Sequence, residues 1–346
     1  MRFIIIILLS SLWGQSWSDY LRSPVKWTLG FTNGYDNNVL RLSAIEKDDA
    51  ALNQTILGGT KTFDSHYVRF SLSGLKNIQL SDREKQIQLF AKSNFSDYIQ
   101  YKHRRYWSGY IKASYRWGAY RRLEYMLRHL DNYYMRHYKD LDITINQLFA
   151  CSFTDREQRL LISHPIILRL WVTGFVSYTQ RYYDQSFTEF DSDIFTIALR
   201  VSKRFRDFGT ISLEGTHGIA DNITFGKGAK SSDLDRSYRH TELYLPLSYD
   251  QGVLGFEEVG LSFRADFRQY RVEDISDPLH SGRSHRETKF DIWGEKSLKE
   301  NLMISCTIRF RNRITDSRYD WVSELKSFDQ IHAWISIEWK MLYDRY

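Results

Sequence analysis

The stretch QIHAWISIEWKML, which runs from Gln330 to Leu342, decides the fold class of this chain. Its apolar residues stand at every second position, namely Ile331, Ala333, Ile335, Ile337, Trp339 and Met341. Successive side chains of an extended strand point to opposite faces, so a period of two predicts a β-strand with one apolar and one polar face. A helix would group its apolar residues at spacings of three and four. A strand of a soluble antiparallel sheet also fits, so the rest of the chain has to decide.

The same alternation recurs along most of the chain. It is found in the segments IFTIALRVSKRF from Ile194, VGLSFRADFRQY from Val259, NLMISCTIRFRNR from Asn301, WSGYIKASYRW from Trp107, DLDITINQLFACSF from Asp140, PIILRLWVTGFVSY from Pro165 and ETKFDIWG from Glu287. Many of these segments are longer than the strands of ordinary globular sheets, for which about five or six residues is typical. The pattern predicts a series of long amphipathic strands.

The connections between these strands alternate in length. Short turns are predicted near 117–119, 206–209, 250–252 and 299–301, and long polar segments at 34–64, 216–239, 271–286 and 313–329. Short turns at one rim and long loops at the other are typical of outer-membrane barrels. We therefore predict an all-β fold, a single transmembrane antiparallel up-and-down β-barrel of about fourteen strands, within a range of roughly twelve to sixteen.

The composition and the N-terminus agree with an exported chain. Of the 346 residues 16% are aromatic and only 4 are proline, and no later stretch is apolar enough for a transmembrane helix. Arg2, the apolar run Phe3–Leu12 and the small residues Ser16 and Ser18 predict a signal peptide over 1–18, cleaved before Asp19. A retained anchor helix is the alternative, but the run is short for spanning a bilayer. The remainder, 19–346, is expected to be one barrel domain.

These features together resemble bacterial outer-membrane β-barrel proteins of the porin type. The resemblance rests on the signal peptide, the amphipathic hairpins, the aromatic residues and a last strand close to the aromatic Tyr346. It implies insertion into the bacterial outer membrane by the assembly machinery, which would recognise the C-terminal strand. The alternation is interrupted over Leu342–Tyr346, so the recognised end is either Tyr343 or Tyr346.

In such a barrel the apolar set faces lipid and the polar set faces the lumen. The pore-lining candidates are Arg116, Arg128, Arg169, Arg200, Arg264, Asp266, Arg268, Lys289, Asp291, Arg309, Arg311, Glu338 and Lys340. Basic residues outnumber acidic ones in this set, and basic side chains on a pore wall favour anionic solutes. Alternatively, the arginines pair with Asp266, Asp291 and Glu338 across strands and simply fill the barrel.

A catalytic or metal site is not predicted. The sequence contains no GxSxG, HExxH or phosphate-binding glycine motif. Asp277, His280 and His285 share one loop and would be the candidates for a metal, but loop histidines without fixed spacing are ordinarily solvated. Cys151 and Cys306 are both expected on the lipid face as free thiols. We expect no cofactor, no metal and no enzymatic activity, with a membrane-embedded hydrolase as the weaker alternative.

The sequence therefore predicts a porin-like channel that passes small polar solutes through a net basic lumen. The alternative is a closed barrel with a structural or receptor role, whose long surface loops bind an envelope partner or a ligand. The expected partners are the lipid bilayer, the assembly machinery and small solutes, and no nucleic acid.

Overall fold

The computed structural model describes residues 24–52, 54–80, 84–139, 148–227 and 234–341. The strands are β1 (Lys26–Asp36), β2 (Ser65–Gln79), β3 (Lys85–Tyr98), β4 (Tyr106–Trp117), β5 (Arg122–Lys139), β6 (Leu148–Ile167), β7 (Leu170–Tyr183), β8 (Ser192–Arg204), β9 (Gly209–Asn222), β10 (Tyr238–Tyr249), β11 (Glu258–Tyr270), β12 (Ser284–Lys299), β13 (Leu302–Asp316) and β14 (Phe328–Lys340). The short helices are α3 (Ala44–Leu52), α4 (Asp320–Lys326), η1 (Gln54–Leu57), η2 (Lys102–Arg104) and η3 (Gln185–Phe190).

The fourteen strands form one closed antiparallel barrel in which each strand pairs with its neighbours in sequence. Closure is made by the first and last strands, where Leu29 lies opposite Trp339 and Phe31 opposite Ile337. Closure leaves no sheet edge with unpaired backbone groups, which is the condition for a sheet to exist in lipid. The predicted fold class and strand number are confirmed.

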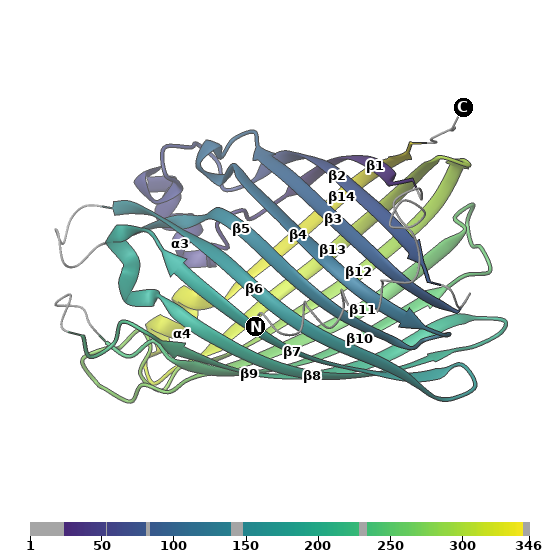
Figure 1. Cartoon of the computed structure of the whole chain (residues 1–346). Coiled ribbons are helices and arrows are strands. Elements are labelled where there is room, and N and C mark those ends of the chain that lie inside the picture. The colour runs from purple at the N-terminus through teal and green to yellow at the C-terminus, as the bar shows by residue number, and fades with distance from the viewer. Residues whose placement is uncertain (1–23, 53, 81–83, 140–147, 228–233, 342–346) are drawn as a thin grey trace.

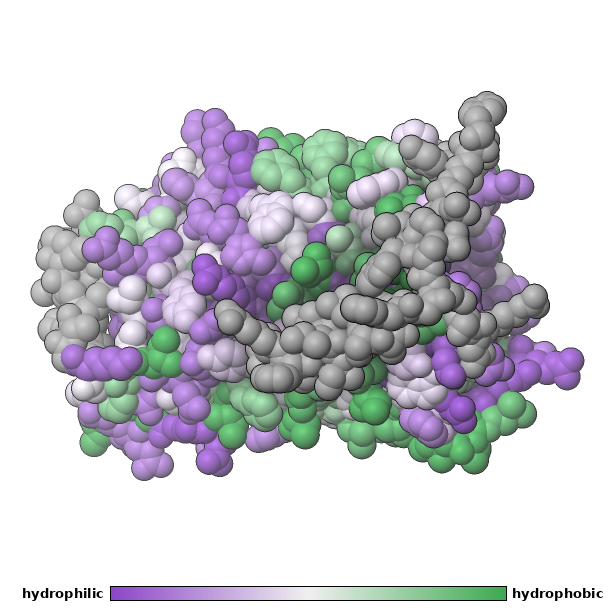
Figure 2. All heavy atoms as spheres, in the orientation of Figure 1, coloured by the Kyte–Doolittle hydropathy of each residue, from purple (hydrophilic) through white to green (hydrophobic). Residues whose placement is uncertain are grey.

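The outward face of the barrel is apolar. Side chains such as Phe31 and Phe70 on neighbouring strands touch with ring centroids 5.3 Å apart. Leu261 and Ile335 are 43% and 51% exposed although each lies in mid-strand. Figure 2 shows hydrophobic side chains reaching the surface over the strands, with hydrophilic ones dense at the end that carries α3 and α4. A soluble barrel would bury these side chains, so the outward face is built for lipid.

The two rims of the barrel differ. Long connections join β1 to β2, β9 to β10, β11 to β12 and β13 to β14 at one rim, which also carries both α-helices (Figure 1). The chain leaves β14 at the opposite rim, beside short connections such as the one between Lys299 and Leu302. One of these turns requires glycine, because a Cβ at Gly209 (φ +145°) would approach the carbonyl oxygen of Ser248 to 2.1 Å. The predicted alternation of short turns and long loops is confirmed.

The helices within the described ranges are all too short or too polar to cross a bilayer.

The pairing of β5 with β6 contains two irregularities near the loop rim, between Leu130 and Tyr133 and between Tyr134 and Arg136. In β6 the inward-facing positions include Asp155 and Glu157, and by the same alternation Cys151 also lies on the inward side, where it is 2% exposed. The expectation that Cys151 faces lipid is therefore wrong. Cys306, which lies opposite the outward Ile335, agrees with its expected face. Both cysteines are free.

Candidate functional site

The inward faces of the strands form a polar lumen. Small hydroxyl residues meet across neighbouring strands in the half nearer the short turns, where Ser202 and Ser212 lie 2.8 Å apart and Thr173 donates to Ser163 over 3.1 Å. These four side chains are only 2–8% exposed, so they pack against one another in the wall and satisfy their hydroxyl groups there. The inward face is therefore polar in this half of the barrel.

Charged side chains follow the inward face of β10 to β13, and we call this row the first charge ladder. Arg309 holds Asp291 through two hydrogen bonds of 2.7 and 2.9 Å. Arg264 lies 3.5 Å from Glu242. Arg268 and Asp266 form a looser pair at 3.6 Å. Arginine and carboxylate therefore alternate along this wall, and the fork-like contact of Arg309 fixes its guanidinium in place.

The first charge ladder ends in a cluster that has more cations than anions. The carboxylate of Glu287 accepts from Arg311 at 2.7 Å and from Arg313 at 2.6 Å, and it lies 3.1 Å from the ammonium of Lys289. One carboxylate cannot neutralise three cations, so the local charge is positive.

A second charge ladder runs over the inward faces of β5 to β9. Glu157 contacts two arginines, Arg128 at 3.2 Å and Arg159 at 2.6 Å. The remaining pairs of this ladder are Arg181 with Asp155 at 2.8 Å and Arg200 with Glu214 at 2.6 Å. The carboxylate of Glu157 is thus shared by two cations, as that of Glu287 is shared by three.

The arginines in the middle of the barrel are accessible to water. The exposed fractions of the Arg128, Arg200, Arg264 and Arg309 side chains are 45%, 39%, 37% and 36%. These residues point inward, so their exposure reports open space within the lumen. Arg264 also stacks on the ring of Tyr244, with the guanidinium 4.3 Å from the centroid. Stacking holds the charge at a defined height in the passage.

The structure places every pore-lining candidate except Arg169 at an inward position of a strand. Asp291 pairs across strands with Arg309, whereas Asp266 pairs with Arg268 in its own strand. Glu338 on β14 reaches Lys92 on β3 at 3.9 Å. Several of these side chains therefore face the inside of the barrel and also pair with an opposite charge.

Arg169 was expected on a strand and is found elsewhere. It occupies the turn between β6 and β7, where its backbone adopts a φ of +60° and its side chain is exposed. The run PIILRLWV looks like one continuous strand because both halves of this hairpin are apolar, and the two turn residues, Leu168 and Arg169, are neither glycine nor proline. Arg169 is thus a rim residue, not a residue of the wall.

The first long loop closes over the mouth of the barrel at the loop rim. We call residues 37–52 and 54–64 the cap. Its apolar residues Val39 and Leu42 are fully buried, and they pack with the inward-facing tyrosines Tyr67 of β2 and Tyr98 of β3 and with Tyr134 of β5. A loop whose core includes inward-facing wall residues must lie within the mouth, so the cap narrows access to the lumen.

Hydrogen bonds fasten the start of the cap to β14. The amide of Asn38 donates to the carbonyl of Asp329 over 2.9 Å, and its carbonyl oxygen accepts from the Leu42 amide over 2.8 Å. The Gln330 amide donates to both carboxylate oxygens of Asp36 over 2.8 and 2.9 Å. The side chains of Asp36 and Asn38 therefore form hydrogen bonds within the turn and with β14, which hold the cap in place.

A buried ion pair joins α3 to the wall. Glu46 accepts a 2.9 Å bond from Arg136, and the two side chains are only 11% and 9% exposed. Glu46 also accepts from the Ser43 amide at 3.0 Å, while the Ser43 hydroxyl accepts from the Glu46 amide at 3.2 Å. This reciprocal capping box starts the helix and aims the carboxylate at the wall.

Arg104, in η2, lies beneath the cap and is 3% exposed. Its guanidinium donates to the carbonyls of Val39 at 3.0 Å and Tyr134 at 3.2 Å, and it also contacts the hydroxyl of Tyr133. Burial raises the pKa of Tyr101 to about 12, so its hydroxyl stays protonated and donates to the Thr62 carbonyl. Sequence reasoning missed these residues, since loop arginines and tyrosines are ordinarily solvated.

The last long loop adds α4 to the same end of the barrel, where it contacts α3. Burial lowers the pKa of Lys326 in α4 to about 7, and the charge of Arg136 lowers it as well. Docked Lys326 is therefore neutral above about pH 7, whereas an undocked lysine stays protonated up to about pH 10.5. Docking must displace a proton within this window, so raising the pH strengthens it, and below about pH 7 the dependence levels off.

We expect α4 to become more protected from chymotrypsin as the pH rises from 7 to 10, with the protease rate corrected on an unfolded substrate. Lys326→Met should remove this pH dependence because methionine does not titrate. A wild-type protection that is flat or falls over this range would contradict the assignment.

The loop between β11 and β12 holds a compact cluster instead of an open ligand set. Asp277 contacts Arg236, and the Nδ1 atom of His280 lies 2.9 Å from the same carboxylate. Burial, with Arg283 and Arg236 close by, holds the pKa of His280 well below its usual range. Within the ranges that the structure describes, His, Cys, Asp and Glu side chains form no group of three or more suited to a metal ion.

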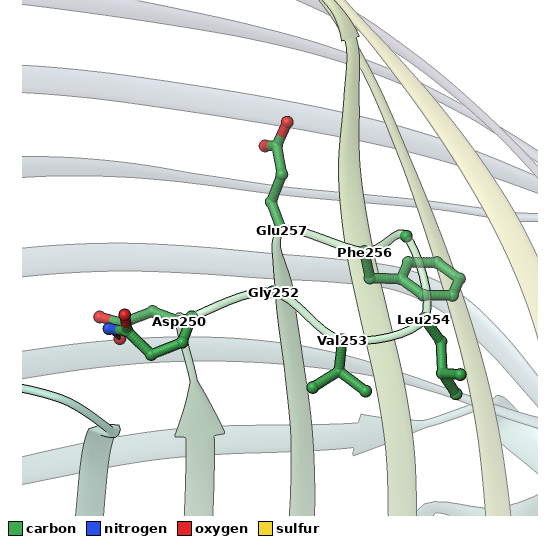
Figure 3. Close-up of a pocket in the computed structure, with 8 residues that line it drawn as sticks. Asp250, Gly252, Val253, Leu254, Phe256 and Glu257 are labelled. Atoms are coloured by element: carbon green, nitrogen blue, oxygen red, sulfur yellow. Dashed lines mark hydrogen bonds between the residues drawn. The ribbon is translucent and has the colours of Figure 1, made fainter.

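A hollow of about 520 Å³ lies outside the lumen, at the turn between β10 and β11 (Figure 3). It is lined by the turn residues 250–257, and Leu254 at its tip is 93% exposed. Because the turn forms it alone, away from the charge ladders, it has no part in the passage.

Comparison with known proteins finds no matching family model and no matching curated protein. Among solved structures, the chain is similar to OccK1 (OpdK) of Pseudomonas aeruginosa, with 10% identity, a TM-score of 0.43 and coverage of 92% of this chain and 99% of the other. It is also similar to a bacterial polysaccharide outer membrane secretin, with 10% identity, a TM-score of 0.44 and coverage of 91% of this chain and 98% of the other. The similarity to Pseudomonas aeruginosa OprD has 10% identity, a TM-score of 0.41 and coverage of 92% of this chain and 97% of the other. At this sequence identity and these TM-scores, the similarity supports no conclusion beyond the barrel fold that the strand pairing already shows.

The closed strand order and the outward apolar face, taken together, make this chain a membrane-spanning β-barrel with the architecture of bacterial outer-membrane proteins.

Proposed function

We propose that this protein is a porin-like outer-membrane channel that passes small polar solutes through a net basic lumen. The observation that carries the proposal is the set of inward-pointing, partly exposed arginines in mid-barrel, among them Arg200, Arg264 and Arg309. A barrel filled by its own side chains would bury these guanidinium groups. Water that reaches them offers a path to other small polar molecules.

The basic character follows from how the carboxylates are shared. Glu157 serves two arginines and Glu287 serves three cations, so each of these groups keeps an excess of positive charge. Fixed cations on a pore wall raise the local concentration of anions and lower that of cations. We therefore propose a preference for anionic solutes.

Replacing both Arg264 and Arg309 with alanine tests the preference. The substitutions remove two exposed cations and leave Glu242 and Asp291 unneutralised, so the wall becomes more acidic. We expect the reversal potential in a tenfold KCl gradient to shift from the anion side towards the cation side. Planar-bilayer recording measures it directly.

The matched control is the pair Glu242→Gln and Asp291→Asn, which removes the partner charges at the same positions. This variant should shift the reversal potential in the opposite direction, towards anions. A wild-type channel without anion preference, or two variants that shift it equally, would reject the basic wall.

The alternative function, a closed barrel whose surface loops bind an envelope partner or ligand, is favoured by the cap. Its buried core shows that the first loop is a folded structure held in the mouth. If a barrel that shows heat-modifiable gel migration conducts no ions in planar bilayers, this alternative is favoured. Stepwise conductance from the same preparation would favour the channel.

Export and assembly remain part of the proposal. We infer a signal peptide over 1–18 and insertion by the assembly machinery through the C-terminal strand, β14. That strand supplies the alternation such a signal needs, with Ile331, Ile335 and Trp339 all outward and exposed. The predicted end points Tyr343 and Tyr346 lie outside the described residues.

A further inference from the structure

A groove of about 650 Å³ lies on the outside of the barrel, near the loop rim of β9 to β13. Its lining includes His217, Arg239, Phe267, Arg286, Ile314 and Asp316, all at outward positions of their strands. Inward residues such as Arg268 also border the groove, but the outward residues outnumber them in the lining. The groove therefore opens outward, away from the lumen.

The shape of the groove comes from small residues beside it. The next outward row towards the membrane centre contains Gly215, Leu243, Ala265 and Thr288 on neighbouring strands. A Cβ built on Gly215 would meet no atom within 4 Å, and Ala265 is only 4% exposed between taller neighbours. The missing side-chain volume forms a hollow between larger side chains, and this hollow runs towards the apolar face.

Two arginines stand over this hollow from alternate strands. Arg239 on β10 lies opposite Gln269, and Arg286 on β12 lies opposite Phe267. Strand spacing places their Cα atoms roughly 10–12 Å apart, within the joint reach of two arginine side chains. Both are exposed, and no carboxylate among the described residues makes a salt bridge with either. Unpaired guanidinium groups at the margin of an apolar face are available to an anion.

The neighbouring side chains add polar contacts within the groove and apolar contacts on its side towards the membrane centre. His217 lies 3.2 Å from the hydroxyl of Thr241 and, like it, is exposed in the groove. Phe267 and Ile314, both 49% exposed, stand in the row beneath Arg239 and continue into the apolar face. A ligand that fits carries an anionic group above and hydrocarbon below.

We propose that this groove binds the phosphate headgroup of an anionic lipid of the outer leaflet, with its acyl chains along the apolar face below Phe267. Arg239 and Arg286 hold the phosphate, and the exposed carboxylate of Asp316 opposes it at one edge. A free phosphate ion would gain nothing from the apolar half of the groove, so continuity with the lipid-facing surface favours the lipid.

Native mass spectrometry of the full folded chain in non-ionic detergent, titrated with phosphatidylglycerol, tests the site. Arg239→Gln with Arg286→Gln should weaken binding by about 30-fold, because each arginine at an anionic membrane surface contributes on the order of fivefold. Asp316→Asn should tighten binding several-fold, since it removes the opposing charge. Heat-modifiable gel migration confirms that each variant is folded.

The matched control is Arg156→Gln, which removes an exposed outward arginine of β6 on another part of the barrel. It should leave binding unchanged. Equal loss in this control, or retention of the lipid in the double variant, overturns the site. Displacement of the lipid by inorganic phosphate at equimolar concentration would identify a phosphate-ion site and overturn the lipid assignment. These readouts do not depend on conductance, so the groove and the channel can fail separately.

Discussion

Ile335→Arg is expected to hinder insertion of the barrel by ~2–4 kcal/mol, the cost of an arginine on the lipid face at mid-bilayer depth. Ile335 lies beside the centre of β14, faces outward and is 51% exposed to the surroundings of the barrel. An arginine there must leave its charge in hydrocarbon or distort the bilayer around it. Leu261→Arg, on the outward face of β11, should have a similar cost. Folding into phospholipid vesicles, followed across a denaturant series, measures the loss.

The neighbouring variant Ser336→Arg is the control for Ile335→Arg. Ser336 faces the lumen, where its hydroxyl lies 2.8 Å from that of Thr32. An arginine at this position can be hydrated, so its cost should be limited to the lost hydrogen bond and local crowding, about 1 kcal/mol. Equal losses for the adjacent outward and inward positions would contradict the face assignment.

Arg136→Met is expected to undock the cap. The substitution removes the partner of Glu46 and leaves a carboxylate uncompensated in a site that is 11% exposed. Removing one partner of a buried ion pair costs roughly 3–5 kcal/mol, and we expect this cost to exceed the free energy that keeps the cap docked. The helix α3 should then lose protection from hydrogen exchange. If the cap limits access to the lumen, the single-channel conductance should rise in the same variant.

The double variant Glu46→Leu with Arg136→Met separates charge from packing. Replacing both partners with apolar side chains removes the uncompensated charge, so docking and the wild-type conductance should be largely restored. Loss of protection without a change in conductance would show that the cap does not control the passage. Unchanged protection in Arg136→Met would show that the ion pair does not hold the cap.

The barrel itself was predictable because its signal is local. The period of two in 330–342, repeated in segment after segment, states which residues face outward, and closure in lipid follows from the need to pair every backbone group. The predicted strand number and the inward placement of Arg264, Arg309 and Glu338 derive from that alternation, and the two kinds of rim derive from the lengths of the connections. The errors arose where the alternation carries no signal. Arg169 sits in a turn without turn residues, and Cys151 lies beside the irregular pairing of β5 with β6.

The partners of the inward charges and the closure of the mouth were decided only by the tertiary structure. Lys92 and Glu338 lie on strands far apart in sequence order, and the cap is held by Glu46 and Arg136 across a separation of 90 residues. The alternation of apolar and polar residues cannot predict such contacts, because they depend on how closure of the barrel brings distant strands and loops together. The sequence by itself determined a barrel with a polar interior, since alternation acts residue by residue. Only the folded chain shows that a loop core fills part of the mouth, since burial of Val39 and Leu42 needs tyrosines from three strands.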